Sequence, residues 1–234
     1  LILSFSLILL FIFYDLYKND DTKPHNHSEN ILDKWILSRL NELINDGTES
    51  LEKFKVFESA RPIRDFINDF STWYVRRSRD RFKSDDAKEK EEALSTTSFV
   101  LLELMKYMAP FAPFFAEEVY QKIRNEGDVE SIHLCSWPKA GNVDEDLLTN
   151  MQKVREVVSA ALELRQKAGH KVRQPLATLT IPNDFSKELL DIISDEVNVK
   201  EVKIEGEIIK LDTNLTEELK NEGVARDVIR GIQD

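Results

Sequence analysis

The chain has a single cysteine, Cys135, among 234 residues. This scarcity excludes an internal disulfide framework and a cysteine-rich zinc ribbon. Glycine and proline are also sparse, with seven of each, which favours short loops and a mainly helical fold. Because structural disulfides belong to oxidising compartments, we expect a reducing, cytoplasmic setting.

Positive charge is scarce overall, since 32 basic residues face 43 acidic residues and the formal net charge is −11. Proteins that bind nucleic acid over much of their surface are usually basic, so this balance argues against blanket binding to nucleic acid. A local site is still compatible with it, because phosphate contacts need cations only where the nucleic-acid backbone passes.

Motifs for catalysis are missing as well. The sequence contains no glycine-rich phosphate loop, no nucleophile elbow and no histidine–glutamate zinc helix. The pairs His25/His27 and His133/Cys135 lack further ligands nearby, so we expect no metal site. The sequence therefore predicts a chain that binds a ligand and does not catalyse a reaction by itself.

The positive charge that is present concentrates in two stretches. Residues 70–83 (FSTWYVRRSRDRFK) set aromatic residues against four arginines and a lysine, and residues 165–176 (RQKAGHKVRQPL) carry four cations and no acid. Arginine pairs with phosphate and aromatic rings stack on bases, so such a stretch can bind RNA. The alternative is a solvated helix face with Trp73 in the core.

Residues 1–28 form an apolar run to Tyr14 and a polar linker. The run is shorter than the roughly 20 residues of a membrane span and lacks the basic start and cleavage site of a secretory signal. We expect a buried helix that packs on the following bundle. A membrane-inserting segment and an incorrectly translated start stay open as alternatives.

Apolar periodicity predicts an antiparallel helix bundle over residues 29–140. The expected helices cover 29–54, 56–82, 87–108 and 114–124. Ser28 should cap the first helix, with Asp33 on its solvent side, and Pro62 should kink or interrupt the second. In that second helix we expect Phe66, Phe70 and Trp73 to point inward. Residues 127–138 are expected to be extended.

Residues 141–234 are expected to form one further helix and a small α+β unit. The predicted elements are a helix over 144–168 ended by Gly169, a strand over 177–181, a helix over 185–193, a hairpin of 197–204 with 207–211, and a closing helix over 215–232 capped by Thr213 or Asn214. The predicted fold is therefore mainly α, with a helix bundle followed by a small α+β C-terminal unit.

Three segments resemble one family in their order along the chain. DKWILSRL from Asp33, WYVRRSRDRF from Trp73 and MAPFAPFFAEEVY from Met108 are similar to the anticodon-binding helix bundle of class I aminoacyl-tRNA synthetases of the branched-chain group. SIHLCSWP from Ser131 resembles the extended turn that follows this bundle. The resemblance runs from about residue 30 to the C-terminus.

Two later segments narrow the resemblance to the isoleucyl-tRNA synthetases. These are residues 165–176 and LDTNLTEELKNEGVARDVIRGIQ over 211–233, and they weigh against the valyl type. The resemblance implies the tRNA-binding part of an isoleucine–tRNA ligase, without the catalytic and editing domains and inactive alone. It implies no cofactor here, since ATP and Mg belong to the missing catalytic domain. The expected partners are isoleucine tRNA and that domain, with no DNA, no membrane attachment and a monomeric state.

With tRNA as the expected ligand, the side chains expected to contact it lie in the two basic stretches and in the closing helix. They are Trp73, Tyr74, Arg76, Arg77, Arg79, Arg81, Arg165, Lys171, Arg173, Gln174, Arg226 and Arg230. The arginines of the first stretch would contact phosphates, while Trp73 or Tyr74 would stack on a base or anchor the helix. Arg226 and Arg230 have the alternative of pairing with Glu218 and Glu222. A protein-interaction module and a membrane-anchored helical domain stay open as other function classes.

Overall fold

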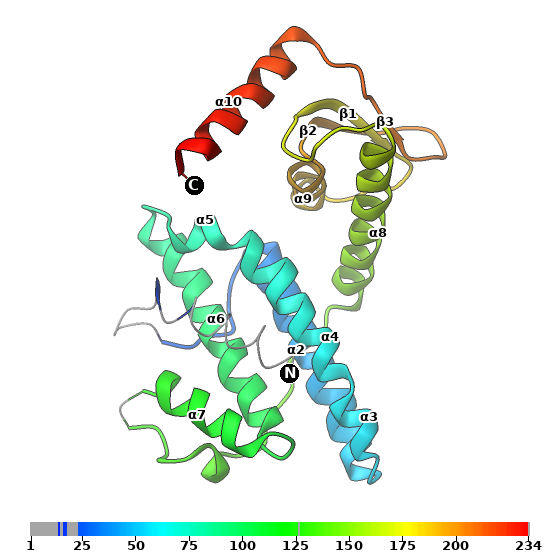
Figure 1. Ribbon diagram of the computed structural model, residues 1–234. Coiled ribbons are helices and arrows are strands. Elements are labelled where there is room, and N and C mark those ends of the chain that lie inside the picture. The colour runs from blue at the N-terminus through cyan, green and yellow to red at the C-terminus, as the bar shows by residue number, and fades with distance from the viewer. Residues whose placement is uncertain (1–13, 15, 18–22, 126, 234) are drawn as a thin grey trace. The chain divides into compact units, whose positions relative to one another are not determined.

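The structure is a computed structural model that describes residues 14, 16–17, 23–125 and 127–233, without the side chains of Arg230 and Gln233. It divides into two compact units, Leu1–Glu145 and Asp146–Asp234. Described strands occur only in the second unit, so the predicted mainly α fold with a small α+β unit is confirmed (Figure 1). The helix expected at the start lies outside the described residues except for its last positions. No described helix has the length and apolar character needed to cross a membrane.

The first unit packs its helices around one apolar core. From residue 31 onward its helices are α2 (Ile31–Glu52), α3 (Val56–Ala60), α4 (Pro62–Asp69), the π-helical turn η1 (Phe70–Val75), α5 (Arg79–Phe82), α6 (Ala87–Met108), α7 (Pro113–Ile123) and the 3-10 turn η2 (Ile132–Leu134). Ile36 and Leu40 of α2, Phe66 of α4, and Leu101 and Leu104 of α6 are fully or almost fully buried. In Figure 1, α3 and α4 follow one another along a single rod, and α5 turns aside at the end of it.

The start of α2 differs from the prediction. Asn30 caps this helix by accepting a hydrogen bond from the Leu32 amide at 2.9 Å. Ser28 lies outside the helix, where its hydroxyl accepts from the Asn30 amide and donates to Asp33. Both residue types can cap, so the sequence alone did not decide between them.

Residues 56–82 are mostly helical, as α3, α4, η1 and α5, which confirms most of the second predicted helix. Pro62 occupies the first turn of α4, where its missing N–H removes no helical hydrogen bond. Trp73 was expected to point inward, and this was wrong: Tyr74 is buried instead, while Trp73 is only partly buried. The reason is η1, because its wider π turn rotates the third residue after Phe70 away from the core side while the fourth, Tyr74, stays on that side. The rings of Phe70 and Tyr74 stack at 5.7 Å.

Residues 127–138 were predicted to be extended, but they contain the turn η2. The hydroxyl of Ser131 accepts from the His133 amide at 3.3 Å and begins this turn. The carboxylate of Glu117 on α7 accepts from the Ile132 amide at 2.9 Å, so the turn is fastened to the bundle. Trp137 then donates its indole N–H to Thr48 of α2 at 2.9 Å.

The second unit contains one long helix and a three-stranded sheet. Its elements are α8 (Glu145–Lys167), β1 (Leu176–Ile181), α9 (Lys187–Val197), β2 (Val199–Ile204), β3 (Lys210–Leu211) and α10 (Glu217–Gln233). Gly169 follows α8 with φ of 74°, which confirms the predicted end of that helix. Thr216, and not Thr213 or Asn214, accepts from a first-turn amide of α10, that of Leu219.

The predicted hairpin between β2 and β3 was wrong. The strand order is β2-β1-β3, with β1 parallel to β2 and antiparallel to β3. The helix α9 supplies the crossover that a parallel pair needs. Leu176, Leu179 and Ile181 of β1 are fully buried, as expected for a central strand.

Gly47 sets how closely α2 and α6 approach. A Cβ at this position would lie 1.7 Å from the hydroxyl oxygen of Tyr107, a buried side chain that is hydrogen-bonded to Ser59. We predict that Gly47→Ala lowers the free energy of unfolding by about 1–3 kcal/mol, measured by urea denaturation. Gly231→Ala is the control, because nothing lies within 4 Å of a Cβ there. The control should be neutral or gain up to about 1 kcal/mol from helix propensity, and equal effects of the two variants would contradict the close packing.

Candidate nucleic-acid interface

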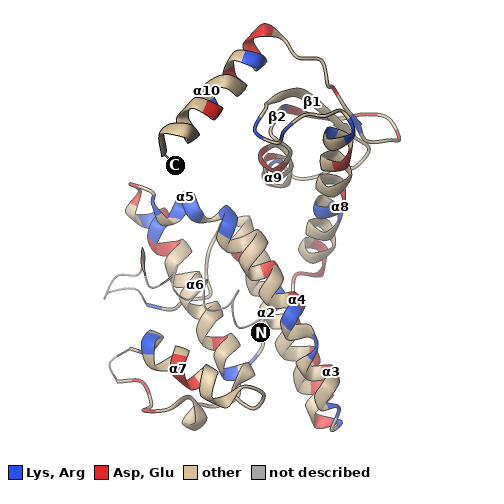
Figure 2. Cartoon of the chain, viewed as in Figure 1, with Lys and Arg blue, Asp and Glu red and all other residues tan. Residues whose placement is uncertain are grey.

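The arginine-rich stretch lies at the end of the rod, where η1 passes into α5. Figure 2 shows basic residues along α5 and the turn before it. Tyr74 is buried in η1, and Arg81 in α5 is 8% exposed. Arg76 and Arg79 are exposed, and Arg77 is partly exposed. The stretch therefore has an interior side and a surface side.

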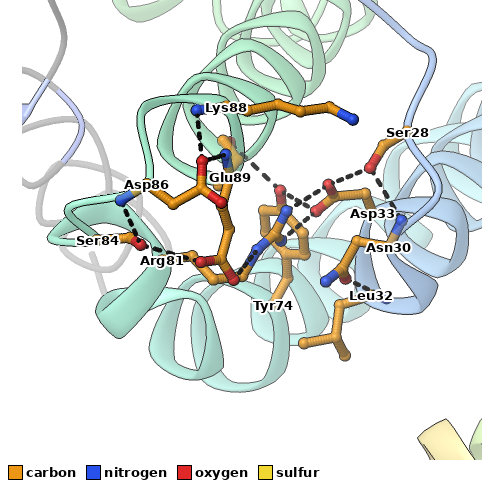
Figure 3. Close-up of polar contacts among 11 residues, drawn as sticks. Ser28, Asn30, Leu32, Asp33, Tyr74, Arg81, Ser84, Asp86, Lys88 and Glu89 are labelled. Carbon is orange, nitrogen blue, oxygen red and sulfur yellow. Dashed lines mark hydrogen bonds and ion pairs between the residues drawn. The ribbon is translucent and has the colours of Figure 1, made fainter.

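The interior side is built on a buried ion pair. The two terminal nitrogens of Arg81 donate to the two carboxylate oxygens of Asp33 at 2.7 and 2.8 Å, and Asp33 is fully buried. The Tyr74 hydroxyl donates to the same carboxylate at 2.8 Å, and the Ser28 hydroxyl does so at 2.7 Å (Figure 3). The carboxylate accepts four hydrogen bonds, which such a buried charge requires. The prediction that Asp33 faces solvent was therefore wrong.

This environment changes the proton affinity of both partners of Asp33. Burial, with the Asp33 charge adding to it, raises the pKa of Tyr74 well above its usual value, so its hydroxyl is a donor. For Arg81, burial works to lower the pKa, but the hydrogen bonds and the charge of Asp33 outweigh it and raise the pKa. The guanidinium of Arg81 therefore stays charged beside Asp33.

The ion pair also reaches the start of α6. Arg81 lies 3.9 Å from Glu89, whose carboxylate accepts from the Ser84 hydroxyl at 3.0 Å. The side chain of Asp86 caps α6 by accepting from the amide of Lys88. Both polar clusters appear in Figure 3. As a result, α2, α5 and α6 share one polar junction, and the surface arginines lie close to it in the sequence.

The second basic stretch is organised around Arg165, which is 1% exposed. Its guanidinium donates to four backbone carbonyl oxygens, those of Lys171 (2.9 Å), Gln174 (2.6 Å), Val197 (2.6 Å) and Asn198 (3.0 Å). Burial lowers its pKa. Arg165 therefore joins the α8–β1 loop to the end of α9.

The other members of this stretch lie around a hollow of about 260 Å³ between the α8–β1 loop and α10. Lys171 and Arg173 are exposed there, and Arg173 pairs with Asp227 of α10 at 3.1 Å. Gln174 donates to the backbone oxygen of Leu219 at 2.6 Å. The hollow presents cations on one side and the helix on the other.

The two residues of α10 that were expected to contact tRNA are Arg226 and Arg230. Arg226 pairs with Glu222 at 2.7 Å, which is the alternative considered for it, and also donates to Asn198 at 2.9 Å. The side chain of Arg230 lies outside the described part of the chain. Sequence patterns missed Asp33 as the residue that organises the first stretch, because its partner lies 48 positions away.

Comparisons with known proteins show the family of this chain. The family described as the anticodon-binding domain of tRNA ligase matches residues 33–181, which is more than half of the chain. The chain belongs to this family, and the resemblance drawn from its motifs is confirmed.

Individual relatives carry a more specific name. A protein named isoleucine–tRNA ligase from Clostridium novyi (strain NT) is 38% identical over 213 residues, which cover 86% of this chain and 20% of the relative. The protein of that name from Chlamydia trachomatis serovar D is 38% identical over 208 residues, with the same coverage. The Clostridium kluyveri protein is 37% identical over 217 residues, covering 86% and 21%. This chain spans about a fifth of the length of these relatives.

Breaking the buried pair should be costly. We predict that Arg81→Met or Asp33→Leu alone lowers the free energy of unfolding by about 3–5 kcal/mol, because each leaves a buried charge without its partner. The double variant should lose clearly less than the sum of the two single losses. Urea denaturation of the four proteins measures this coupling, and additive losses would show that the pair does not act as a unit.

Arg165 offers a second test of a buried guanidinium. Lysine is a point charge with three donors and cannot reproduce the four carbonyl contacts. We predict that Arg165→Lys loses about 2–4 kcal/mol of unfolding free energy. Arg173→Lys, at an exposed pair in the same loop, should change it by less than about 1 kcal/mol. Similar losses for the two variants in thermal and urea denaturation would refute the structural role of Arg165.

Proposed function

We propose that this chain is the tRNA-binding part of an isoleucine–tRNA ligase. The proposal rests on the surface formed by Arg76, Arg77 and Arg79. This surface lies within the segment matched by the anticodon-binding family, and the buried Asp33–Arg81 pair stabilises the same segment. The relatives named isoleucine–tRNA ligase support the choice of tRNA. In an acidic chain, such a cluster marks a specific place for phosphates.

The chemistry of the surface follows from the guanidinium group. Its planar donors match phosphate oxygens, and it stays charged at any physiological pH. Arg76 donates its Nε–H to the Thr72 backbone oxygen at 2.7 Å, which fixes the direction of its side chain. Tyr74 and Arg81 take no part in tRNA contact in this proposal, because both are buried and their polar groups bind Asp33. Trp73, only partly buried, is the aromatic residue of η1 that can meet a base.

The hollow in the second unit is the second proposed tRNA contact. Lys171 and Arg173 would bind phosphates there, and Gln174 holds the loop in place through Leu219. Arg165 supports this loop from inside and does not contact the ligand. Arg226 and Arg230 belong to the proposed contact as its outer part on α10.

The remaining partners are proposed from the relatives. The catalytic and editing domains of the ligase lie outside this chain, and ATP and Mg bind in the catalytic domain. The chain alone is then inactive in aminoacylation. We propose a monomer that binds neither DNA nor membranes.

The test replaces two surface arginines. We predict that Arg76→Ala/Arg77→Ala weakens the binding of isoleucine tRNA about tenfold or more at low salt, since each lost charged hydrogen bond removes more than about 1.4 kcal/mol. The slope of log affinity against log salt should become shallower by about 1–2. Fluorescence anisotropy titrations at several salt concentrations measure both quantities.

The matched control is Lys122→Ala/Arg124→Ala, which removes two exposed cations from the end of α7. It should leave affinity and salt slope close to those of the unchanged chain. Equal weakening by both double variants would indicate attraction by overall charge alone. Unchanged affinity of the Arg76/Arg77 variant would defeat the assignment of this surface.

A further inference from the structure

The cations beside the hollow of the second unit are paired with carboxylates of α10. Arg173, in the α8–β1 loop, pairs with Asp227 at 3.1 Å. Lys200 of β2 pairs with Glu222 at 2.6 Å, and Arg226 pairs with the same carboxylate at 2.7 Å. Two acidic side chains of α10 therefore neutralise three cations, which we call the paired cations.

A carboxylate at these positions resembles a bound phosphate. The hydrogen bond from Lys200, with the charges of Lys200 and Arg226 adding to it, lowers the pKa of Glu222, so this residue is ionised at neutral pH. Carboxylate and phosphate offer the same kind of charged oxygen acceptor to basic side chains. A phosphate that reaches one of the paired cations must therefore replace a carboxylate that already lies there.

The first half of α10 is attached to the unit without these ion pairs. Leu219 is buried, and its backbone oxygen accepts from the Gln174 side chain at 2.6 Å. Gly223 approaches the same side chain so closely that a Cβ there would lie 2.2 Å from Oε1 of Gln174. These contacts hold α10 beside the hollow.

Beyond Gly223 the described contacts of α10 with the rest of the unit are polar and exposed. Val224, Val228 and Ile229 are all more than half exposed, so this half of the helix buries little apolar surface. The side chains of Arg173 and Asp227 are each 49% exposed. Ion pairs with this exposure contribute little to stability, so this pair can open with a small change in free energy.

We propose that α10 masks the hollow, because its two carboxylates compete with tRNA phosphates for the paired cations. The proposal rests on the proposed tRNA-binding function and adds a self-inhibiting contact at its second surface. Lys171 is exposed in the same hollow and forms no ion pair with any described residue, so it can meet a phosphate first. Exchange at Arg173 then replaces one charged oxygen acceptor by another.

The alternative is that the ion pairs only fasten α10 to the unit. Two observations weigh against it. Leu219 and Gln174 already fasten the helix. The pair of Arg226 with Glu222 lies within α10 itself, four positions apart, so it joins no two elements.

The experiment measures the binding of labelled isoleucine tRNA to the full chain by fluorescence anisotropy at low salt. Asp227→Asn should tighten binding about 2- to 5-fold, because Arg173 no longer has a competing carboxylate. Glu222→Gln/Asp227→Asn should tighten it further. The Tm of Asp227→Asn should stay within about 4 °C of the unchanged chain, since an exposed pair is lost.

Two controls separate masking from overall charge. Asp191 is an exposed residue of α9 that pairs with no described cation, and Asp191→Asn changes the net charge by the same amount as Asp227→Asn. It should change the affinity clearly less. In the Arg173→Ala background, Asp227→Asn should no longer tighten binding, because the cation that Asp227 covers is gone.

Unchanged or weaker tRNA binding by Asp227→Asn would overturn the mask. Equal tightening by Asp191→Asn, or tightening that persists without Arg173, would do so as well, since both indicate net charge alone. If Arg76→Ala/Arg77→Ala weakens tRNA binding and Asp227→Asn has no effect, only the mask fails. If the unchanged, folded chain does not bind tRNA, the proposed function and the mask fail together.

Discussion

The buried pair of Asp33 and Arg81 is the interaction on which the first unit depends. It brings the beginning of α2, the end of the rod and the beginning of α6 to one point, although its partners are 48 residues apart. Separating such a buried charge from its partner strongly destabilises the fold, because it leaves an unsolvated ion. The pair therefore fixes the direction in which the rod ends. The surface arginines lie on that end, so their position is a consequence of the pair.

The second unit also contains a buried arginine that joins distant segments, but its acceptors are backbone oxygens. Arg165 has no carboxylate partner and instead satisfies four backbone oxygens, two in the α8–β1 loop and two at the end of α9. In both stretches one arginine is structural and its neighbours are on the surface. An acidic protein can in this way hold short basic surfaces in a defined place without raising its overall charge. Acidic surroundings also discourage nucleic acid from docking elsewhere.

Local signals in the sequence predicted the parts of the fold that local interactions decide. The spacing of apolar residues located α6 and α8 almost to the residue, and Gly169 marked the end of α8 correctly. The choice of caps was less certain, since Asn30 and Ser28 are both able to cap α2. The family resemblance was visible because its motifs are long and lie within these helices.

The errors came from interactions that a local pattern does not contain. Asp33 looks like a solvent residue on a helical wheel, and only the distant Arg81 makes it a buried one. Trp73 is not in the core because the wider π turn rotates the third residue after Phe70 away from the core side, while the fourth, Tyr74, stays on it. The strands β2 and β3 are separated by a short loop that suggests a hairpin, yet both pair with β1. For the site, the sequence located both basic stretches, but it did not separate structural arginines from surface ones.

The proposed function is that this chain recognises isoleucine tRNA through two localised basic surfaces. The most direct measurement is a filter-binding titration of the folded chain with isoleucine, valine and unrelated tRNAs at two salt concentrations. We expect binding that prefers isoleucine tRNA and weakens steeply as salt rises. Binding that is absent, or that is equal for all tRNAs and insensitive to salt, would contradict it.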